Sequence, residues 1–295
     1  MSVKVRDFAA GRKAFFIVPD TSVFSEDNLS YYFLLGFECY FIQNEKSFPI
    51  QKKIEIIAST FSDCVLFINI DAVIEGINWV EYINKLNQTY GSCITICVTF
   101  LKKQDKNFKN VVEMTFKNKI GIKGDCIQLE YQKRINVGII QNYLASIRLQ
   151  GRRQNIRAFC TRAYTYAFKQ NDYNYTGVIQ DISLSHFSIA LPLNALDIRV
   201  GTVIPDFNFY LNGLIMRNPV TLIMVRVLND CVLYVFAFAN LNGVPGLSDR
   251  FKDQLVTNLL KLNNNYLKVT LEKILLQITN DMHDPEVLGN LEIGS

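Results

Sequence analysis

The chain has 295 residues, of which 49% are hydrophobic, 21 are Phe and 14 are Tyr. This composition excludes a largely disordered chain, and the length suggests two domains that each bury a core of their own. The net charge of +4, from 31 basic and 27 acidic residues, is too balanced for a general nucleic-acid-binding protein, so any anion site must be local.

The N-terminal segment MSVKVRDFAAGRKAFFIVPD has charges between its apolar residues, which is not typical of a signal peptide. No apolar run approaches the length of a membrane span, so we expect no membrane insertion and a cytoplasmic location. The seven cysteines are odd in number and contain no CxxC pair, which indicates buried thiols in a reducing compartment. Neither His186 nor His283 lies near a cysteine pair, so no metal site is expected.

Residues 1–146 alternate between short apolar runs and segments with helical spacing. Apolar runs without polar alternation are typical of strands buried on both faces, and strands that alternate with helices indicate a parallel sheet. The pattern predicts a doubly wound α/β domain that resembles flavodoxin or a response-regulator receiver. The predicted strands are AFFIV (14–18), CYFIQ (39–43), CVLFINI (64–70), CITICVTF (93–100) and KIGIK (119–123).

The receiver comparison can be tested on the residues that a phosphorylation site needs, because these hold a magnesium ion and an acyl phosphate. The first strand supplies one acid, Asp20, where a pair is expected. The third ends at Asn69, with Asp71 two residues late, whereas Thr99 and Lys123 lie at roughly suitable positions. We therefore expect a receiver-shaped domain that is used for contacts rather than as a phosphorylation site. The absence of GxGxxG and GxxxxGK[ST] gives no support to a dinucleotide site or a P-loop.

After Arg157 the pattern changes to strands, and residues 147–280 are predicted to form a small antiparallel β-barrel with a trailing helix. The stretch AFCTRAYTYAFKQ (158–170) predicts one strand, and LNDC (228–231) predicts a hairpin turn. The strand would place a set of alternating side chains on one face. This set is Cys160, Arg162, Tyr164, Tyr166 and Phe168.

The helix that follows is predicted to begin at an N-cap, Ser248. Phe251, Leu255, Leu259 and Leu262 then recur at the spacing of one helical face, which we expect to pack against the barrel. Residues 281–295 are polar and contain Gly and Pro, so a flexible tail is expected there.

Two short motifs flank the start of the predicted barrel. Arg152, Arg153 and Arg157 form RRxxxR just before it, and by themselves they would be typical of a solvated hinge. Asp181-Ile-Ser183-Leu-Ser-His186 follows 24 residues later. In this order and separation the pair resembles the RRxxxR and DxSxxG motifs of the PilZ family over residues 148–270, with His186 in place of the glycine. The α/β domain ahead of it, and the composition rich in Asn, Ile and Lys, are similar to spirochaetal PilZ proteins.

The resemblance implies binding of cyclic di-GMP by Arg152, Arg153, Arg157, Asp181 and Ser183. A guanidinium group can hold a phosphate bidentately or contact a guanine base. Asp181 would accept from guanine N–H groups, and Ser183 would add a hydroxyl contact. A glycine would allow close approach or a positive φ. For His186, packing in the loop and contact with the ligand, by stacking on a base or donating to a phosphate, are both open.

The leading hypothesis is a non-enzymatic receptor for cyclic di-GMP that needs no cofactor. Ligand binding would order the interdomain linker and relay the signal to an unidentified protein partner in motility, adhesion or virulence. The alternative is a ligand-independent adaptor of the same fold. An enzyme is not expected, because no nucleophile motif accompanies either histidine and no paired acids mark a hydrolase. The aromatic barrel is compatible with single-stranded nucleic acid, but the modest charge argues against binding of nucleic acid, DNA included.

Overall fold

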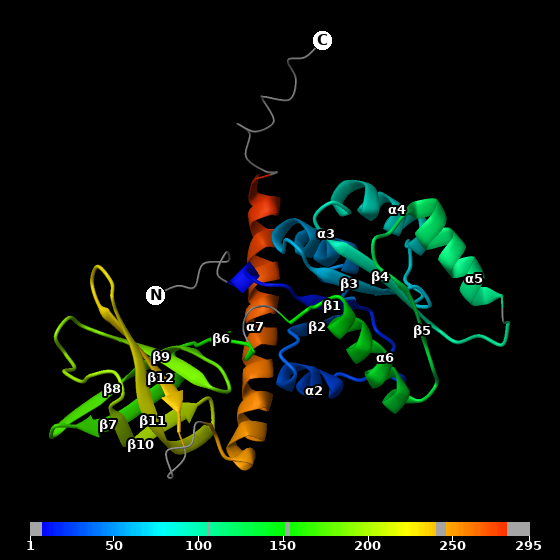
Figure 1. Ribbon diagram of the computed structural model, residues 1–295. Helices are drawn as coiled ribbons and strands as arrows, with labels where there is room; N and C mark the ends of the chain where they lie inside the picture. The colour runs from blue at the N-terminus through cyan, green and yellow to red at the C-terminus, as the bar shows by residue number, and fades with distance from the viewer. Residues whose placement is uncertain (1–7, 106, 151–153, 240–245, 282–295) are drawn as a thin grey trace. The chain divides into compact units, whose positions relative to one another are not determined.

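The computed structural model describes residues 8–105, 107–150, 154–239 and 246–281 (Figure 1). Its contacts divide the chain into two compact units. One comprises Met1–Tyr32, Phe37–Arg152 and Tyr266–Ser295, and the other comprises Phe33–Gly36 and Arg153–Asn265. The tail predicted to be flexible, beyond residue 281, lies outside the described residues.

The first unit contains the predicted parallel sheet. Its strand order is β2-β1-β3-β4-β5, and every neighbouring pair is parallel. This order is the flavodoxin-like arrangement, so the predicted fold class is confirmed for this half of the chain. The strands are β1 (Ala14–Ile17), β2 (Cys39–Ile42), β3 (Val65–Asn69), β4 (Thr95–Leu101) and β5 (Cys126–Leu129).

Helices cover both faces of this sheet, as the doubly wound pattern requires (Figure 1). On one face the Tyr32 hydroxyl of α2 (Asn28–Leu34) donates to the Val137 carbonyl of α6 (Lys133–Ser146) at 3.0 Å. On the other face the Tyr82 hydroxyl of α4 (Trp79–Tyr90) donates to the Gln51 carbonyl of α3 (Ile50–Thr60) at 3.2 Å. The helix α5 (Phe108–Glu113) continues directly into a π-helix, η1 (Met114–Ile120).

The predicted strand at KIGIK (119–123) is wrong. Ile120 is the last residue of η1, and Gly121 ends that helix with a left-handed φ of +76° while its N–H bonds to the Phe116 carbonyl. Such a glycine is a common way to end a helix, because it carries no Cβ. The two isoleucines therefore flank a helix terminus, and the fifth strand begins only at Cys126.

The second unit is the predicted antiparallel β-barrel. Within the described residues, six strands close into a ring in the order β8-β7-β10-β11-β12-β9, and β9 pairs back onto β8. A short strand, β6 (Ala158–Phe159), adds to the end of β8. The ring consists of β7 (Tyr164–Gln170), β8 (Tyr173–Ile182), β9 (His186–Leu191), β10 (Val203–Leu211), β11 (Leu214–Val227) and β12 (Val232–Phe238).

The stretch 158–170 forms two strands instead of the single strand predicted. The Tyr164 N–H bonds to the Thr161 carbonyl at 3.0 Å, which makes a turn between β6 and β7. Arg162 lies in that turn and is exposed, so it does not continue the buried face. The predicted alternation holds within β7, where Tyr164, Tyr166 and Phe168 are buried.

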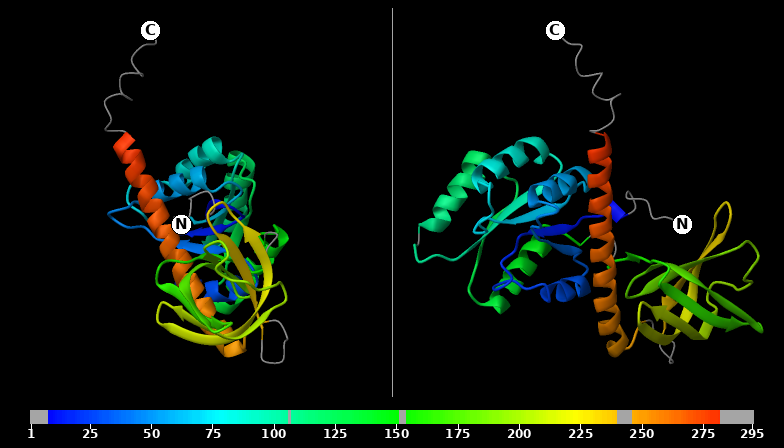
Figure 2. Two further views of the ribbon diagram at one scale, coloured as in Figure 1. Left: turned by 90° about the vertical axis from the view of Figure 1, so that its left-hand side faces the viewer. Right: turned by 180° about the vertical axis from the view of Figure 1, so that it is seen from behind.

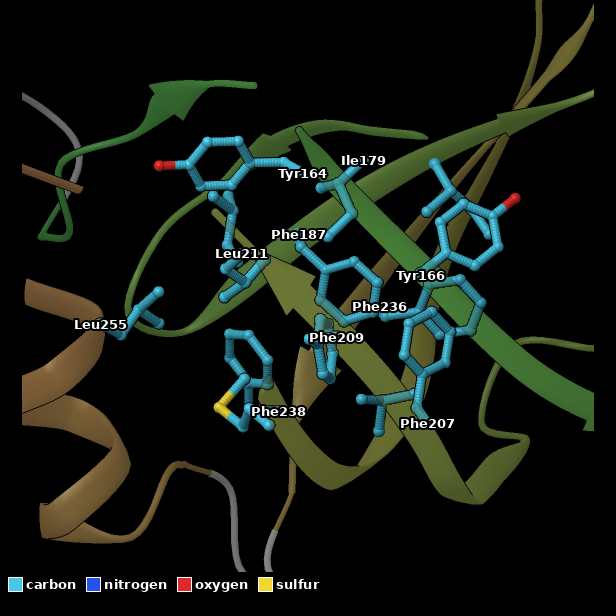
Figure 3. Close-up of a cluster of buried hydrophobic side chains, with 14 of the residues drawn as sticks. Tyr164, Tyr166, Ile179, Phe187, Phe207, Phe209, Leu211, Phe236, Phe238 and Leu255 are labelled. Atoms are coloured by element: carbon cyan, nitrogen blue, oxygen red, sulfur yellow. The ribbon is translucent and has the colours of Figure 1, made fainter. Parts of the chain in front are cut away.

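Aromatic rings fill the barrel (Figure 3). The ring of Phe187 lies 4.9 Å from that of Phe207 and 5.3 Å from that of Phe236, centroid to centroid. Each comes from a different strand, namely β9, β10 or β12. Packed aromatic pairs stabilise a core beyond the area that they bury, so this cluster fixes how the strands meet.

Tight turns connect the barrel strands where the sequence offers Asn, Asp and Gly. Asn171 and Asp172 have φ values of +49° and +65° between β7 and β8, and Asn212 and Gly213 have +47° and +93° between β10 and β11. Two successive residues with positive φ are typical of hairpin turns that match the strand twist. The predicted turn at LNDC is confirmed, since the Leu228 N–H bonds to the Cys231 carbonyl at 2.8 Å.

The trailing helix, α7 (Asp249–Asp281), is much longer than the amphipathic segment that predicts it, and both views of Figure 2 show it unbroken. Leu255, Leu259 and Leu262 are buried in the barrel core, and Phe251 packs against it, so the predicted apolar face is confirmed. None of the helices in the described part of the chain combines the length and apolar character that a membrane crossing requires.

Candidate ligand site

Strand register brings Arg157, the last residue of the first motif, next to the second motif on the barrel. Arg157 directly precedes β6, and β6 pairs with the end of β8 so that Phe159 lies opposite Asp181. On its other side β8 pairs with β9, which places Asp181 opposite Ser188. An irregularity of the ladder between Ile179 and Asp181 re-aims β8 at this point, as bulges near sites commonly do.

Arg157 and Asp181 form an ion pair at the centre of this cluster. The Arg157 Nε atom lies 3.2 Å from Asp181 Oδ1, and an Nη1–H donates to Oδ2 at 3.4 Å. The Ser188 hydroxyl donates to the same Oδ2 at 2.7 Å. The Asp181 side chain is only 14% exposed, against 36% for Arg157. The carboxylate is therefore held in one orientation, and the guanidinium group keeps access to solvent.

Ser183 and His186 close the turn between β8 and β9. The buried Ser183 hydroxyl donates to the His186 carbonyl at 3.0 Å and accepts from the His186 N–H at 3.1 Å. The Ser183 N–H also bonds to the His186 carbonyl at 2.8 Å. His186 has no positive φ, so its backbone does not need a glycine. The Ser183 hydroxyl thus shapes the turn that carries His186.

The His186 ring is held by a second polar contact. Its Nδ1 lies 2.7 Å from the Ser185 hydroxyl oxygen, which also accepts from the Asn155 amide at 3.0 Å. Burial lowers the pKa of His186, and the positive charge of Arg157 acts in the same direction. Both effects favour the neutral imidazole, in which one ring nitrogen donates a hydrogen bond and the other accepts one.

Alternation along β9 decides which face of the sheet the cluster occupies. Phe187 and Ile189 are completely buried and belong to the barrel core. Because neighbouring side chains in a strand point to opposite faces, His186 and Ser188 lie on the outer face of the barrel. Asp181 shares that face through its pairing with Ser188.

Of the six predicted site residues, Arg157, Asp181, Ser183 and His186 lie within this cluster or its turn. Arg152 and Arg153 lie outside the described residues. Sequence reasoning missed Ser188, Ser185 and Asn155, which orient Asp181 and His186. Their proximity to the motifs in sequence is the only signal that points to them, since small polar residues are common in turns.

Among the described residues, there is little support for two other kinds of site, a reactive thiol and a metal centre. Burial raises the pKa of the nearby Cys160 thiol well above its usual range, with the charge of Asp181 acting in the same direction. A thiol that stays protonated is a poor nucleophile. In the described part of the chain, no three His, Cys, Asp or Glu side chains come together as a metal site requires.

At the carboxyl end of the parallel sheet, the residues at receiver-like positions make contacts with other residues of the fold. Asp71 accepts from the Leu101 N–H at 2.6 Å and pairs with Lys103 at 3.0 Å, and the Asn69 amide donates to the Val18 carbonyl at 3.0 Å. Lys123 bonds to the Ser92 carbonyl, before β4, and so lies at the opposite end of the strands. Its expected placement beside a phosphorylation site is wrong, because the fifth strand begins after it.

No family model and no curated protein matches the chain. Among solved structures, it is similar to YcgR from Escherichia coli in complex with c-di-GMP, with 17% identity and a TM-score of 0.35 over 42% of this chain and 51% of that chain. The PilZ domain of YcgR with c-di-GMP matches with 16% identity and a TM-score of 0.35, over 41% of this chain and 98% of that one.

The Bacillus subtilis inhibitor of motility, MotI/DgrA, matches with 12% identity and a TM-score of 0.32, over 39% of this chain and 53% of that chain. The match spans about half the length of the YcgR and MotI/DgrA chains. These likenesses concern the fold.

Proposed function

We propose that this protein is a non-enzymatic receptor for cyclic di-GMP, and that the outer face of the barrel around Arg157 and Asp181 binds the ligand. The observation that carries the proposal is the pairing of the end of β8 with β6 on one side and β9 on the other, beside which the last arginine of RRxxxR contacts the aspartate of the second motif. Arg157 and Asp181 lie 24 residues apart in sequence, and their contact on one surface is what a shared ligand requires.

The chemistry of the cluster suits a cyclic dinucleotide. Arg157 offers a fixed positive charge and a planar fork, which suits a phosphate or a guanine edge. Asp181 already accepts from Arg157 and Ser188, but a carboxylate has about four acceptor positions, so it can still accept from guanine N–H groups. Arg152 and Arg153, on the linker, would contribute further contacts to the ligand.

The relay to a partner is part of the same proposal. Ligand binding would order the linker that carries Arg152 and Arg153 and change how the α/β unit and the barrel are arranged. A ligand shifts such an equilibrium only through its different affinity for the two arrangements. The output would be a contact with a protein of motility, adhesion or virulence signalling in the cytoplasm. Small-angle scattering with and without ligand tests this relay, and an unchanged profile at saturation would contradict it.

A ligand-independent adaptor is the second candidate. It is favoured by one observation, namely that the polar groups of the site already satisfy one another. Arg157 is paired with Asp181, and the Ser183 hydroxyl is used within its own turn. In this case the same surface would serve only protein contacts.

Calorimetric titration of the full-length protein with cyclic di-GMP separates the two candidates. We expect saturable binding by the wild type, and binding at least about tenfold weaker for Arg157→Ala or Arg153→Ala, because a charged hydrogen bond contributes about 1.5–3 kcal/mol. Arg217→Ala is the matched control, since Arg217 also lies on the barrel and donates to an aspartate, Asp206, at 2.9 Å. Its affinity should equal that of the wild type.

Two results would overturn the receptor. Wild-type protein that shows neither heat nor a thermal shift with cyclic di-GMP would leave the adaptor as the better account. Binding that weakens equally in Arg157→Ala and Arg217→Ala would show that net charge, and not this site, holds the ligand.

A further inference from the structure

A second contact joins the two motifs, beside the ion pair of Arg157 and Asp181. Its residues occupy positions that neither motif specifies, because Asn155 lies between the arginines of RRxxxR and Ser185 lies just before His186. The Asn155 amide donates to the Ser185 hydroxyl oxygen at 3.0 Å, and that oxygen lies 2.7 Å from Nδ1 of His186. These three side chains form a polar chain that ends on the imidazole ring.

The turn that carries Ser185 and His186 is anchored to the barrel. The Ser185 carbonyl accepts from the Phe238 N–H of β12 at 3.0 Å. The strand β12 also pairs with β9 from His186 to Leu191. Groups held on paired strands are placed more precisely than groups on free loops, so the barrel fixes the position of the Ser185 hydroxyl.

The neighbouring hydroxyl of Ser183 decides which atom donates in the contact between Ser185 and His186. A serine hydroxyl has one hydrogen and can accept two hydrogen bonds. The Ser183 hydroxyl donates to the His186 carbonyl and accepts from the N–H groups of Ser185 and His186. It therefore has no acceptor position left for the Ser185 hydroxyl, whose oxygen lies 3.4 Å away. The Ser185 hydrogen points instead to Nδ1 of His186, across the shorter distance of 2.7 Å.

The tautomer of His186 follows from this contact. A neutral imidazole that accepts at Nδ1 carries its hydrogen on Nε2, and both burial and the charge of Arg157 favour the neutral ring. The ring lies on the outer face of the barrel, two residues along β9 from Ser188, which is paired with Asp181. Among the described residues, the hydrogen bond of this ring is the one at Nδ1. Nε2–H is therefore a donor available to a ligand on the surface that holds Arg157 and Asp181.

We propose that Asn155 and Ser185 are positioning residues that hold His186 in the Nε2–H tautomer, and that this N–H donates to a phosphate oxygen of the ligand. The inference rests on the proposed function, because it adds a contact to the same site. The acceptor is assigned to a phosphate because the nearby guanidinium group of Arg157 favours an acceptor that carries negative charge. A glycine at position 186 has no side chain to make this contact, so His186 adds a donor that the motif residue lacks.

Proton–nitrogen correlation spectra of the imidazole rings measure the tautomer in the full-length protein without ligand. The chain has two histidines, so His283→Gln leaves the signals of His186 alone. At about pH 8, above the ordinary pKa of histidine, we expect the hydrogen on Nε2. Ser185→Ala should give a mixture of tautomers, and Ser185→Thr should restore the Nε2–H form. The control is Ser30→Ala, which removes a hydroxyl of the α/β unit and should change nothing. A wild-type ring with its hydrogen on Nδ1 would overturn the proposal.

Calorimetric titration with cyclic di-GMP tests the contact with the ligand. His186→Gln should keep most of the affinity, because its amide can donate from nearly the position of Nε2. His186→Phe keeps a ring but has no donor, so it should bind about tenfold more weakly, and so should His186→Gly, because a hydrogen bond to a charged group is lost. Ser185→Ala should also weaken binding, and Ser185→Thr should restore it.

The same series names the results that would overturn the contact. Full affinity in His186→Phe with a loss in His186→Gln would show that the ring stacks on a base. Full affinity in all three variants would show that His186 only packs in its turn.

A cyclic di-GMP with sulfur in place of one phosphate oxygen tests the acceptor, because sulfur accepts hydrogen bonds weakly. It should bind more weakly than cyclic di-GMP, with a larger loss for the wild type than for His186→Phe, and equal losses would overturn the phosphate as acceptor. Wild-type protein that binds no cyclic di-GMP would overturn the proposed function and this contact with it. The ring spectra would still decide the tautomer, so the two failures are distinguishable.

Discussion

At the scale of single residues, the candidate site is held together by small polar contacts around Asp181. The carboxylate accepts from Arg157 and Ser188, and both contacts fix its direction. A preorganised site loses less side-chain entropy on binding, because the rotamers are already fixed. Asp181 is thus the residue on which the geometry of the cluster depends, and Arg157 is the one with access to solvent.

His186 predicts a pH dependence of stability. Its pKa is lowered in the folded protein, first by burial and then by Arg157, from an ordinary value of 6.5. As the pH falls below 6.5, His186 binds protons more readily in the unfolded chain than in the folded protein, so the contribution of His186 to stability decreases. We expect the wild type to lose more stability than His186→Gln when urea unfolding is measured at pH 7 and at about pH 5. Parallel losses in the two proteins would show that His186 does not report on folding.

At the scale of elements, the strand β8 organises the barrel. Its first part pairs with β7, and its end pairs with β6 and β9, which is where the candidate site lies. Gly177 in the first part lies opposite Tyr166 of β7, whose hydroxyl is buried without a hydrogen-bond partner among the described residues. Figure 3 shows the Tyr166 hydroxyl at the margin of the aromatic cluster. The strand pair therefore tolerates a large ring only because the opposite residue has no side chain.

Gly177→Ala should destabilise the barrel. The added Cβ would lie 2.8 Å from the Tyr166 hydroxyl and 3.0 Å from its ring, and overpacking of a core costs about 1–3 kcal/mol. Adding Tyr166→Phe should recover part of this loss, because the nearest atom is removed and no hydrogen bond is sacrificed. Urea unfolding of the two single variants and the double variant measures the coupling.

Gly138→Ala is the control for this substitution. Gly138 lies within α6, where an added Cβ meets no atom within 4 Å. Alanine is a better helix former than glycine, so this variant should gain about 1 kcal/mol. Gly177→Ala with a stability equal to that of the wild type would mean that the β7–β8 pair adjusts at no cost.

At the scale of the whole molecule, α7 belongs to both compact units. Its residues to Asn265 group with the barrel, and those from Tyr266 group with the α/β unit. Leu259 is completely buried in the barrel core, and Leu271 is 4% exposed. Within the α/β unit, the Tyr266 ring lies 4.6 Å from that of Phe8. One helix thus supplies core residues to two units.

Substitutions at the two ends of this helix should destabilise different units. Removal of a buried leucine side chain costs about 2–5 kcal/mol. The only tryptophan, Trp79, lies in α4 of the α/β unit, so its fluorescence reports on that unit. We expect Leu271→Ala to lower the urea midpoint of the transition followed by Trp79 fluorescence. Leu259→Ala should leave that midpoint largely unchanged and lower the urea midpoint of the part of the circular-dichroism change that does not coincide with it. Equal shifts of the Trp79 midpoint would contradict two separate units.

The elements themselves could be predicted from sequence, because local patterns decide them. Buried parallel strands read as apolar runs, β7 shows its two-residue alternation, and Leu255 to Leu262 follow one helical face. The errors arose where a local pattern is ambiguous. Ile120 and Ile122 resemble a strand, but the left-handed Gly121 ends a helix between them. Arg162 fits an alternating pattern, but a hydrogen bond across a turn breaks the strand there.

The sequence by itself determined the fold class, the presence of two motifs and the identity of Arg157 and Asp181 as candidates, since periodicity and residue type are local properties. Only the tertiary structure decided that Arg157 and Asp181 meet, that Ser188 orients the carboxylate, and that Ser183 and His186 close a turn with ordinary backbone angles. It also decided that β11 extends beyond its pairing with β10. These features depend on register, that is, on which residues of different strands lie opposite one another, and register is set by the packing of the whole barrel.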